Sequence, residues 1–105
     1  MSLYAASKSA VRCSARSWAQ GLGGRGARVN VLSPGPVETE GFRESQGETP
    51  GEAERTVNAW ATTPRPYGEA DRDASAALFL ATDESSFVTG RDLHGDGGMA
   101  IRRPA

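Results

Sequence analysis

The chain has 105 residues, of which 37% are hydrophobic, and its 12 basic and 13 acidic side chains leave a formal net charge of -1. This length allows one small domain at most, and the absence of a basic excess argues against a nucleic-acid or membrane-surface partner. The single cysteine excludes an internal disulfide framework, and no apolar run has the length of a membrane span. We therefore expect a soluble, cytoplasmic protein.

Residues 3–22 are predicted to form a helix. Val11, Ala15, Trp18 and Leu22 recur at spacings of four, three and four, which places them on one helical face. Alanine and serine are frequent, and no proline interrupts the segment. A cluster of glycines over residues 21–26 then ends the helix.

A short strand is predicted over residues 28–32, where β-branched valines alternate with other side chains. Pro34 and its neighbours should stop it, because proline cannot continue a central ladder. The polar stretch 37–63 is too long for a plain connector, so it is either a functional loop or poorly ordered. Residues 52–61 within it could form a short helix.

A second helix is predicted over residues 69–82, with Asp71 and Asp73 in its first turns, where negative charge suits the helix dipole. Its apolar face is expected to comprise small residues and one leucine, namely Ala70, Ala74, Ala77, Leu78 and Ala81. A short strand over 92–94 and a glycine-rich turn follow. Strand, helix and strand in this order predict a right-handed parallel crossover in an α/β layer. Two strands cannot cover both helices, so the pattern indicates part of a larger sheet.

Tyr4 and Lys8 are the pair most capable of chemistry. Four residues apart, they share one face of the first predicted helix. Tyrosine in water releases its proton only near about pH 10, and a nearby ammonium favours the phenolate. The pair could therefore act as a general acid and base. An amphipathic tyrosine beside a solvated lysine is the alternative, and for this short pattern alone it is the better interpretation.

Four blocks of sequence change that interpretation. In order along the chain they are residues 4–11 (YAASKSAV), 28–39 (RVNVLSPGPVET), 79–90 (FLATDESSFVTG) and 96–98 (DGG). They resemble the active-site helix, the following strand and its turn, the last helix with the entry to the last strand, and the closing turn of short-chain dehydrogenases/reductases. The chain thus resembles the C-terminal part of that family's Rossmann-like, doubly wound parallel sheet. The implied domain, residues 1–105, is partial and lacks the N-terminal dinucleotide-binding half.

The resemblance implies an NAD- or NADP-dependent oxidoreductase that transfers a hydride between nicotinamide and a small carbonyl or alcohol substrate. Tyr4 would be the acid/base, and Lys8 would activate it and hydrogen-bond the nicotinamide ribose. Which of the two cofactors is used, the substrate and the direction of reaction stay open.

The resemblance also implies a cofactor-binding turn. Pro34, Gly35 and Val37 would pack on the nicotinamide, with glycine allowing close backbone approach to a ligand. Thr39 would contact the carboxamide or the phosphates. A mere strand stop is the alternative for Pro34 and Gly35. No metal site is expected, because the residues around His94 lack metal-ligand spacing.

Features of the family that would precede Met1 include the glycine-rich phosphate turn and the catalytic serine. The chain alone is therefore expected to be inactive. Two further hypotheses stay open. In one, the chain is an oligomerisation module, since relatives commonly form dimers or tetramers through the helix bearing Tyr4 and through the last helix and strand. In the other, it is a decayed remnant that barely folds.

Overall fold

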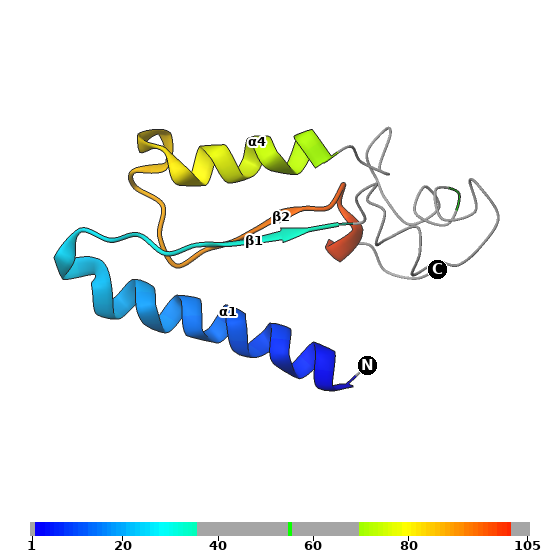
Figure 1. Ribbon diagram of the computed structural model, residues 1–105, viewed down its shortest axis with the longest axis horizontal. Coiled ribbons are helices and arrows are strands. Elements are labelled where there is room, and N and C mark those ends of the chain that lie inside the picture. The colour runs from blue at the N-terminus through cyan, green and yellow to red at the C-terminus, as the bar shows by residue number, and fades with distance from the viewer. Residues whose placement is uncertain (1, 36–54, 56–69, 102–105) are drawn as a thin grey trace. The chain divides into compact units, whose positions relative to one another are not determined.

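The computed structural model describes residues 2–35, Arg55 and residues 70–101. Its main elements, labelled in Figure 1, are helix α1 (Ser2–Leu22), strand β1 (Val31–Pro34), helix α4 (Ala70–Ala81) and strand β2 (Asp92–Gly95). Short 3-10 turns follow three of them, at Gly23–Arg25, Asp83–Ser85 and Met99–Ile101. The chain divides into two compact units, one of residues 1–32 with 78–93 and the other of residues 33–77 with 94–105.

Helix α1 follows the prediction from its alanine-rich sequence and extends from Ser2 to Leu22. It ends in a turn closed by Gly26, whose positive φ of 75° suits glycine and whose N–H donates to the Gly23 carbonyl. Ala15 and Ala19 are buried, and they are the only buried hydrophobic residues among those described. Ala19 lies near Gly90, since a Cβ built on that glycine would lie 3.6 Å from the Ala19 Cβ, an ordinary van der Waals distance.

The predicted apolar face of α1 is only partly covered. Ala15 is buried, but Val11 and Trp18 on the same face are 57% and 60% exposed. The predicted helix is therefore confirmed. The large side chains of its predicted apolar face, however, are exposed rather than buried.

Strands β1 and β2 lie side by side in a two-stranded sheet (Figure 1). In the first unit the Val31 N–H donates to the Arg91 carbonyl over 2.8 Å, and in the second the Gly35 N–H donates to the Gly95 carbonyl over 3.0 Å. Residue numbers rise together on both strands, so the pairing is parallel. The expected partial α/β sheet, of the Rossmann-like type, is thus confirmed.

Strand β1 begins three residues later than predicted, because the segment before it hydrogen-bonds largely through side chains. Asn30 donates from Nδ2 to the Val88 carbonyl, and its Oδ1 accepts the Arg91 N–H. The Val29 N–H donates to Thr89 Oγ1. Side chains thus replace part of the backbone ladder ahead of Val31.

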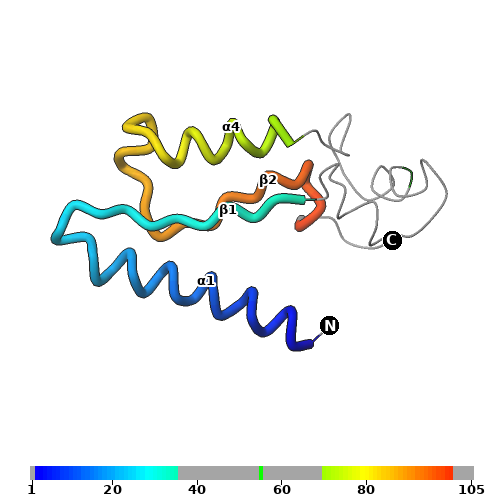
Figure 2. The backbone as a smooth tube through the Cα atoms, in the orientation of Figure 1, coloured from blue at the N-terminus to red at the C-terminus, as the bar shows by residue number. Residues whose placement is uncertain are grey.

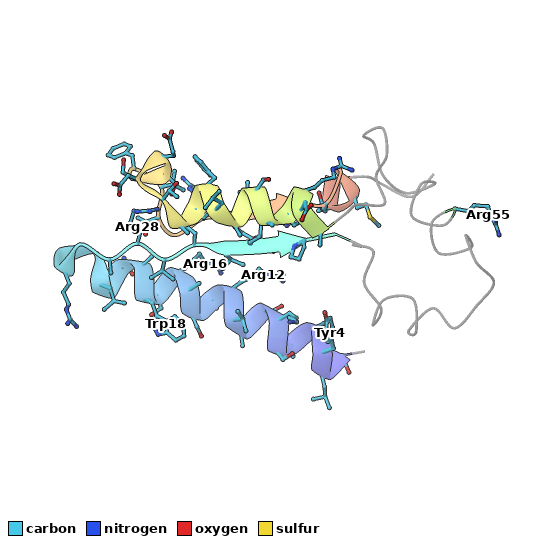
Figure 3. All side chains as sticks on the ribbon, turned by 45° about the horizontal axis from the view of Figure 1, so that its top comes forward. Tyr4, Arg12, Arg16, Trp18, Arg28 and Arg55 are labelled. Carbon is cyan, nitrogen blue, oxygen red and sulfur yellow. The ribbon has the colours of Figure 1, made fainter. Side chains whose placement is uncertain are left out.

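A polar cluster around Arg28 joins the entry of β1 to the end of α4. Its guanidinium donates to Ser85 Oγ and to the carbonyls of Val88, Leu80 and Thr82, at 2.9, 3.1, 3.3 and 3.1 Å. Figure 2 shows the chain returning from α4 (yellow) past this point toward β2 (orange), and Figure 3 labels Arg28 there. Ser85 is only 1% exposed. The cluster satisfies carbonyls at the C-terminus of α4 that the helix itself leaves unpaired.

Helix α4 confirms the second predicted helix, but the predicted apolar face is wrong. Every residue of that face is exposed, namely Ala70, Ala74, Ala77, Leu78 and Ala81. The half-buried positions are instead Asp73, Ala76 and Leu80, which follow one another at spacings of three and four. Alanine gives little preference between faces, so the pattern of small residues could not fix the rotation of the helix.

The possible helix over 52–61 lies outside the described residues except for Arg55, which is exposed. Within the described part of the chain, no helix is long and apolar enough to cross a membrane.

Candidate functional site

One candidate feature is the pair Tyr4 and Lys8 near the start of α1, within the first compact unit. One helical turn separates them, and the Lys8 Nζ lies 5.5 Å from the centroid of the Tyr4 ring. This is the distance of a cation–π contact. The structure therefore brings together the two residues that the sequence singles out.

Both side chains are open to solvent, and Tyr4 is 62% exposed (Figure 3). The Ser7 hydroxyl donates to the main-chain carbonyl of Tyr4 over 2.7 Å. This bond links the first turn of the helix and does not use the Tyr4 side chain. In this conformation the ammonium lies over the ring face. The phenol and the ammonium therefore lie close together on the same exposed face of the helix.

A separate candidate feature is the turn after β1, which belongs to the other compact unit. Pro34 is the exposed last residue of β1, and Gly35 follows it, half-buried. A Cβ added at Gly35 would lie 2.7 Å from the Asp96 Cα and 2.9 Å from its Cβ. Real side chains do not approach backbone this closely, so the position requires glycine. The sequence predicted a close approach of a ligand here, and the described neighbour is Asp96.

Asp96 organises the closing turn of the chain. Its Oδ1 accepts the Gly98 N–H and its Oδ2 accepts the Ala100 N–H, each at 2.9 Å. Gly97 and Gly98 have positive φ values of 64° and 88°, which glycine adopts without strain. The carboxylate therefore caps the turn in the manner of an aspartate at a helix start.

Asp96 also affects a second carboxyl in the same unit. Burial raises the pKa of Asp73, the charge of Arg72 lowers it, and the charge of Asp96 raises it further. Like charges and desolvation both disfavour the ionised form of Asp73. This is a local property of the first turns of α4.

Val37 and Thr39 lie outside the described residues. Among the residues that the structure does describe, no group of histidine, cysteine and acidic side chains could hold a metal ion.

Sequence reasoning missed the contact between Gly35 and Asp96, and the anchoring role of Arg28. Gly35 and Asp96 each belong to a block that resembles the family. That shared resemblance is the feature of the sequence that could have suggested the contact between them. Neither periodicity nor spacing could have paired residues that stand so far apart in the chain.

Comparison with known proteins gives a consistent result. The family model described as Enoyl-(Acyl carrier protein) reductase matches residues 1–100. A 3-oxoacyl-[acyl-carrier-protein] reductase, FabG, of Thermotoga maritima is 40% identical over 98 residues, which are 93% of this chain and 38% of the relative.

Solved structures agree in both fold and class. A short-chain type dehydrogenase/reductase from Mycobacterium ulcerans matches with a TM-score of 0.83 and 34% identity, over 95% of this chain and 35% of that one. A blue fluorescent protein from a metagenomic library, in complex with NADPH, matches with a TM-score of 0.76 and 40% identity, over 94% of this chain and 38% of that one. The chain thus spans well under half the length of the proteins that it matches.

Proposed function

The chain belongs to the short-chain dehydrogenase/reductase family, and on that premise we propose that it provides the acid/base part of an NAD(P)-dependent oxidoreductase. The substrate is a small molecule with a carbonyl or an alcohol group. In reduction Tyr4 donates its hydroxyl proton to the carbonyl oxygen, and in oxidation it accepts the alcohol proton. Lys8 stabilises the phenolate that remains after donation.

One observation carries the proposal: the Lys8 Nζ lies 5.5 Å from the Tyr4 ring centroid while both side chains are exposed on α1. A proton-transfer group must reach a substrate, and a tyrosine needs a stabilised anion to work near neutral pH. The exposure of the pair and the closeness of the ammonium to the ring support this role.

The residues suit a nicotinamide nucleotide in their chemistry. An ammonium and a phenol on one helix face can hydrogen-bond the hydroxyls of a ribose, and NADPH is bound in the metagenomic relative. When bound, the nicotinamide supplies or accepts the hydride. We propose that Lys8 and Tyr4 hold the ribose side, and that Pro34, Gly35 and Val37, with Thr39, contact the nicotinamide part. The choice between NAD and NADP is left to experiment.

The first experiment titrates the 105-residue chain with NADH and with NADPH and follows nicotinamide fluorescence. We expect saturable binding that Lys8→Met weakens by about tenfold or more, as expected when a charged hydrogen-bond donor is removed. Arg12→Met is the matched control, since it removes a cation one turn further along the same helix. Binding that is equally weakened by both variants would show a general charge effect, and it would remove Lys8 from the proposal.

The second experiment tests Tyr4 itself. NADPH oxidation is measured with a panel of ketones, with the chain alone and with a polypeptide corresponding to the part of FabG that this chain does not match. We expect turnover in the mixture and its loss in Tyr4→Phe, with cofactor binding retained. Turnover that survives Tyr4→Phe would exclude the residue from proton transfer.

We also propose a cytoplasmic location.

A further inference from the structure

The end of β1 and the closing turn of the chain meet at one pair of residues in the second compact unit (Figure 1). A Cβ added at Gly35 would lie 2.7 Å from the Asp96 Cα, 2.9 Å from its Cβ and 3.2 Å from its carbonyl oxygen. The Gly35 N–H also donates to the Gly95 carbonyl over 3.0 Å. The Cα and the carbonyl oxygen belong to the main chain, so no rotation of the Asp96 side chain would make room for a larger residue. The main chain at Gly35 therefore lies directly against the main chain at Asp96.

The side chain of Asp96 stabilises the closing turn on the other side of this contact. Its two carboxylate oxygens accept the N–H groups of Gly98 and Ala100, and its carbonyl accepts the Met99 N–H over 3.3 Å. All three bonds run forward into the turn. Gly97 and Gly98 adopt positive φ there, and glycine loses much conformational freedom when it is held in one conformation. The carboxylate bonds offset that loss, so the position of the turn depends on Asp96.

From this geometry we infer that Asp96 is a positioning residue for the cofactor-binding turn that begins at Pro34 and Gly35. Its carboxylate holds the closing turn, and the closing turn holds the main chain of Gly35, so Asp96 acts through Gly35. The inference rests on the proposed function, because it takes this turn to contact the nicotinamide part of the cofactor. It adds that glycine is required at position 35 by a contact within the protein, and that a distant carboxylate determines how well the turn is ordered for the cofactor.

Electrostatics alone predicts the opposite effect of removing this carboxylate. A nicotinamide nucleotide carries negative phosphate, so the loss of a negative charge from the protein would reduce repulsion and favour binding. The positioning role predicts weaker binding, because a loosened turn must be ordered again when the cofactor binds. The direction of the change in affinity therefore separates the two effects. Asp73 provides a matched control, since it is a second carboxyl of the same unit, and its pKa is raised by burial and also by the charge of Asp96.

The first measurement is amide exchange of the full chain, which does not require the cofactor. In Asp96→Ala the Gly35 N–H should exchange at least about fivefold faster, as expected when a capping side chain is lost. The Val31 N–H, which donates to the Arg91 carbonyl in the first unit, should keep its protection. Asp96→Asn keeps one oxygen acceptor and should give an intermediate rate. Asp73→Asn should not speed the exchange of Gly35.

The second measurement is a fluorescence titration with NADH or NADPH, whichever the original chain binds more tightly. We expect Asp96→Ala to raise the Kd by at least about fivefold, because the cost of ordering the turn is then subtracted from the binding energy. Asp96→Asn should again be intermediate, which would be rescue by the conservative variant. Asp73→Asn should bind at least as tightly as the original chain, since it removes a negative charge and leaves the Gly35 contact in place.

The two measurements distinguish failure of the inference from failure of the proposed function. Unchanged exchange of the Gly35 N–H in Asp96→Ala overturns the inference, and so does an Asp96→Ala chain that binds the nucleotide as tightly as the original chain. An original chain that binds neither nucleotide, while Gly35 still responds to Asp96, overturns the proposed function and leaves Asp96 with a purely structural role. If Val31 also loses protection in Asp96→Ala, the variant is unfolded, and the same two results are then required of Asp96→Asn.

Discussion

Replacing Arg28 with methionine should destabilise the first unit strongly, because one side chain there serves four acceptors. Three of them are main-chain carbonyls around the end of α4, and the fourth is the hydroxyl of the nearly inaccessible Ser85. Methionine keeps much of the length and the apolar stem, so the change removes the guanidinium and little packing.

The magnitude follows from the bonds. A hydrogen bond to a charged group contributes about 1.5–3 kcal/mol. Two effects reduce the sum for Arg28: it is half-buried, and the Ser85 hydroxyl can itself donate to the carbonyl of Leu80 or of Thr82. We therefore expect a loss of about 3 kcal/mol in the free energy of unfolding, out of a typical total of about 5–15 kcal/mol. For a domain of this size that corresponds to a fall in Tm of roughly 10–20 °C.

Urea denaturation followed by circular dichroism measures the loss, and amide exchange locates it. The N–H groups of Ser85, Ser86 and Val88, which donate within the turn after α4, should lose protection first. Arg16→Met, an exposed change on α1, is the control and should stay within about 0.5 kcal/mol of the original chain. An Arg28→Met chain as stable as that control would refute the reasoning, since the four bonds would then contribute nothing.

Three further predictions concern the second unit. Gly35→Ala should lower Tm and disturb the pairing of β1 with β2, because its Cβ would lie 2.7 Å from the Asp96 Cα; an unchanged Tm would contradict this contact. Asp96→Ala should expose the Gly98 and Ala100 N–H groups, with a cost of about 1 kcal/mol measured by thermal unfolding. Asp73 has a raised pKa in the folded state, so its ionisation weakens folding as the pH rises through that pKa, and Asp73→Asn should gain stability relative to the original chain between pH 3 and pH 7. A difference in Tm that is independent of pH would refute the last prediction.

Local features of the sequence predict the elements well. The helices over 3–22 and 69–82 are observed at Ser2–Leu22 and Ala70–Ala81, and the strand over 92–94 at Asp92–Gly95. Helix propensity, glycine breaks and acidic first turns act within a few residues, so a single sequence contains them.

What the sequence could not predict depends on contacts between distant segments. The strand expected over 28–32 begins at Val31, because Asn30 bonds to groups about 60 residues away. The partial burial of Leu80, rather than of Leu78 and its alanine neighbours, likewise depends on how α4 is oriented in the fold.

The candidate site divides in the same way. Tyr4 and Lys8 could be paired from their spacing because one helix carries both, and the structure brings them together. The turn of Pro34 and Gly35 came only from the family resemblance, and Val37 and Thr39 stay predictions. The role of Asp96 beside Gly35 required the three-dimensional structure.

The parallel pairing of β1 with β2 has a consequence for synthesis on the ribosome. The partners are about 60 residues apart, as Val29 and Thr89 illustrate. At roughly 5–20 residues per second, about 3–12 seconds pass between the emergence of the two strands. During that interval β1 has no β2 to pair with, so its unpaired backbone groups are open to other chains before the sheet exists.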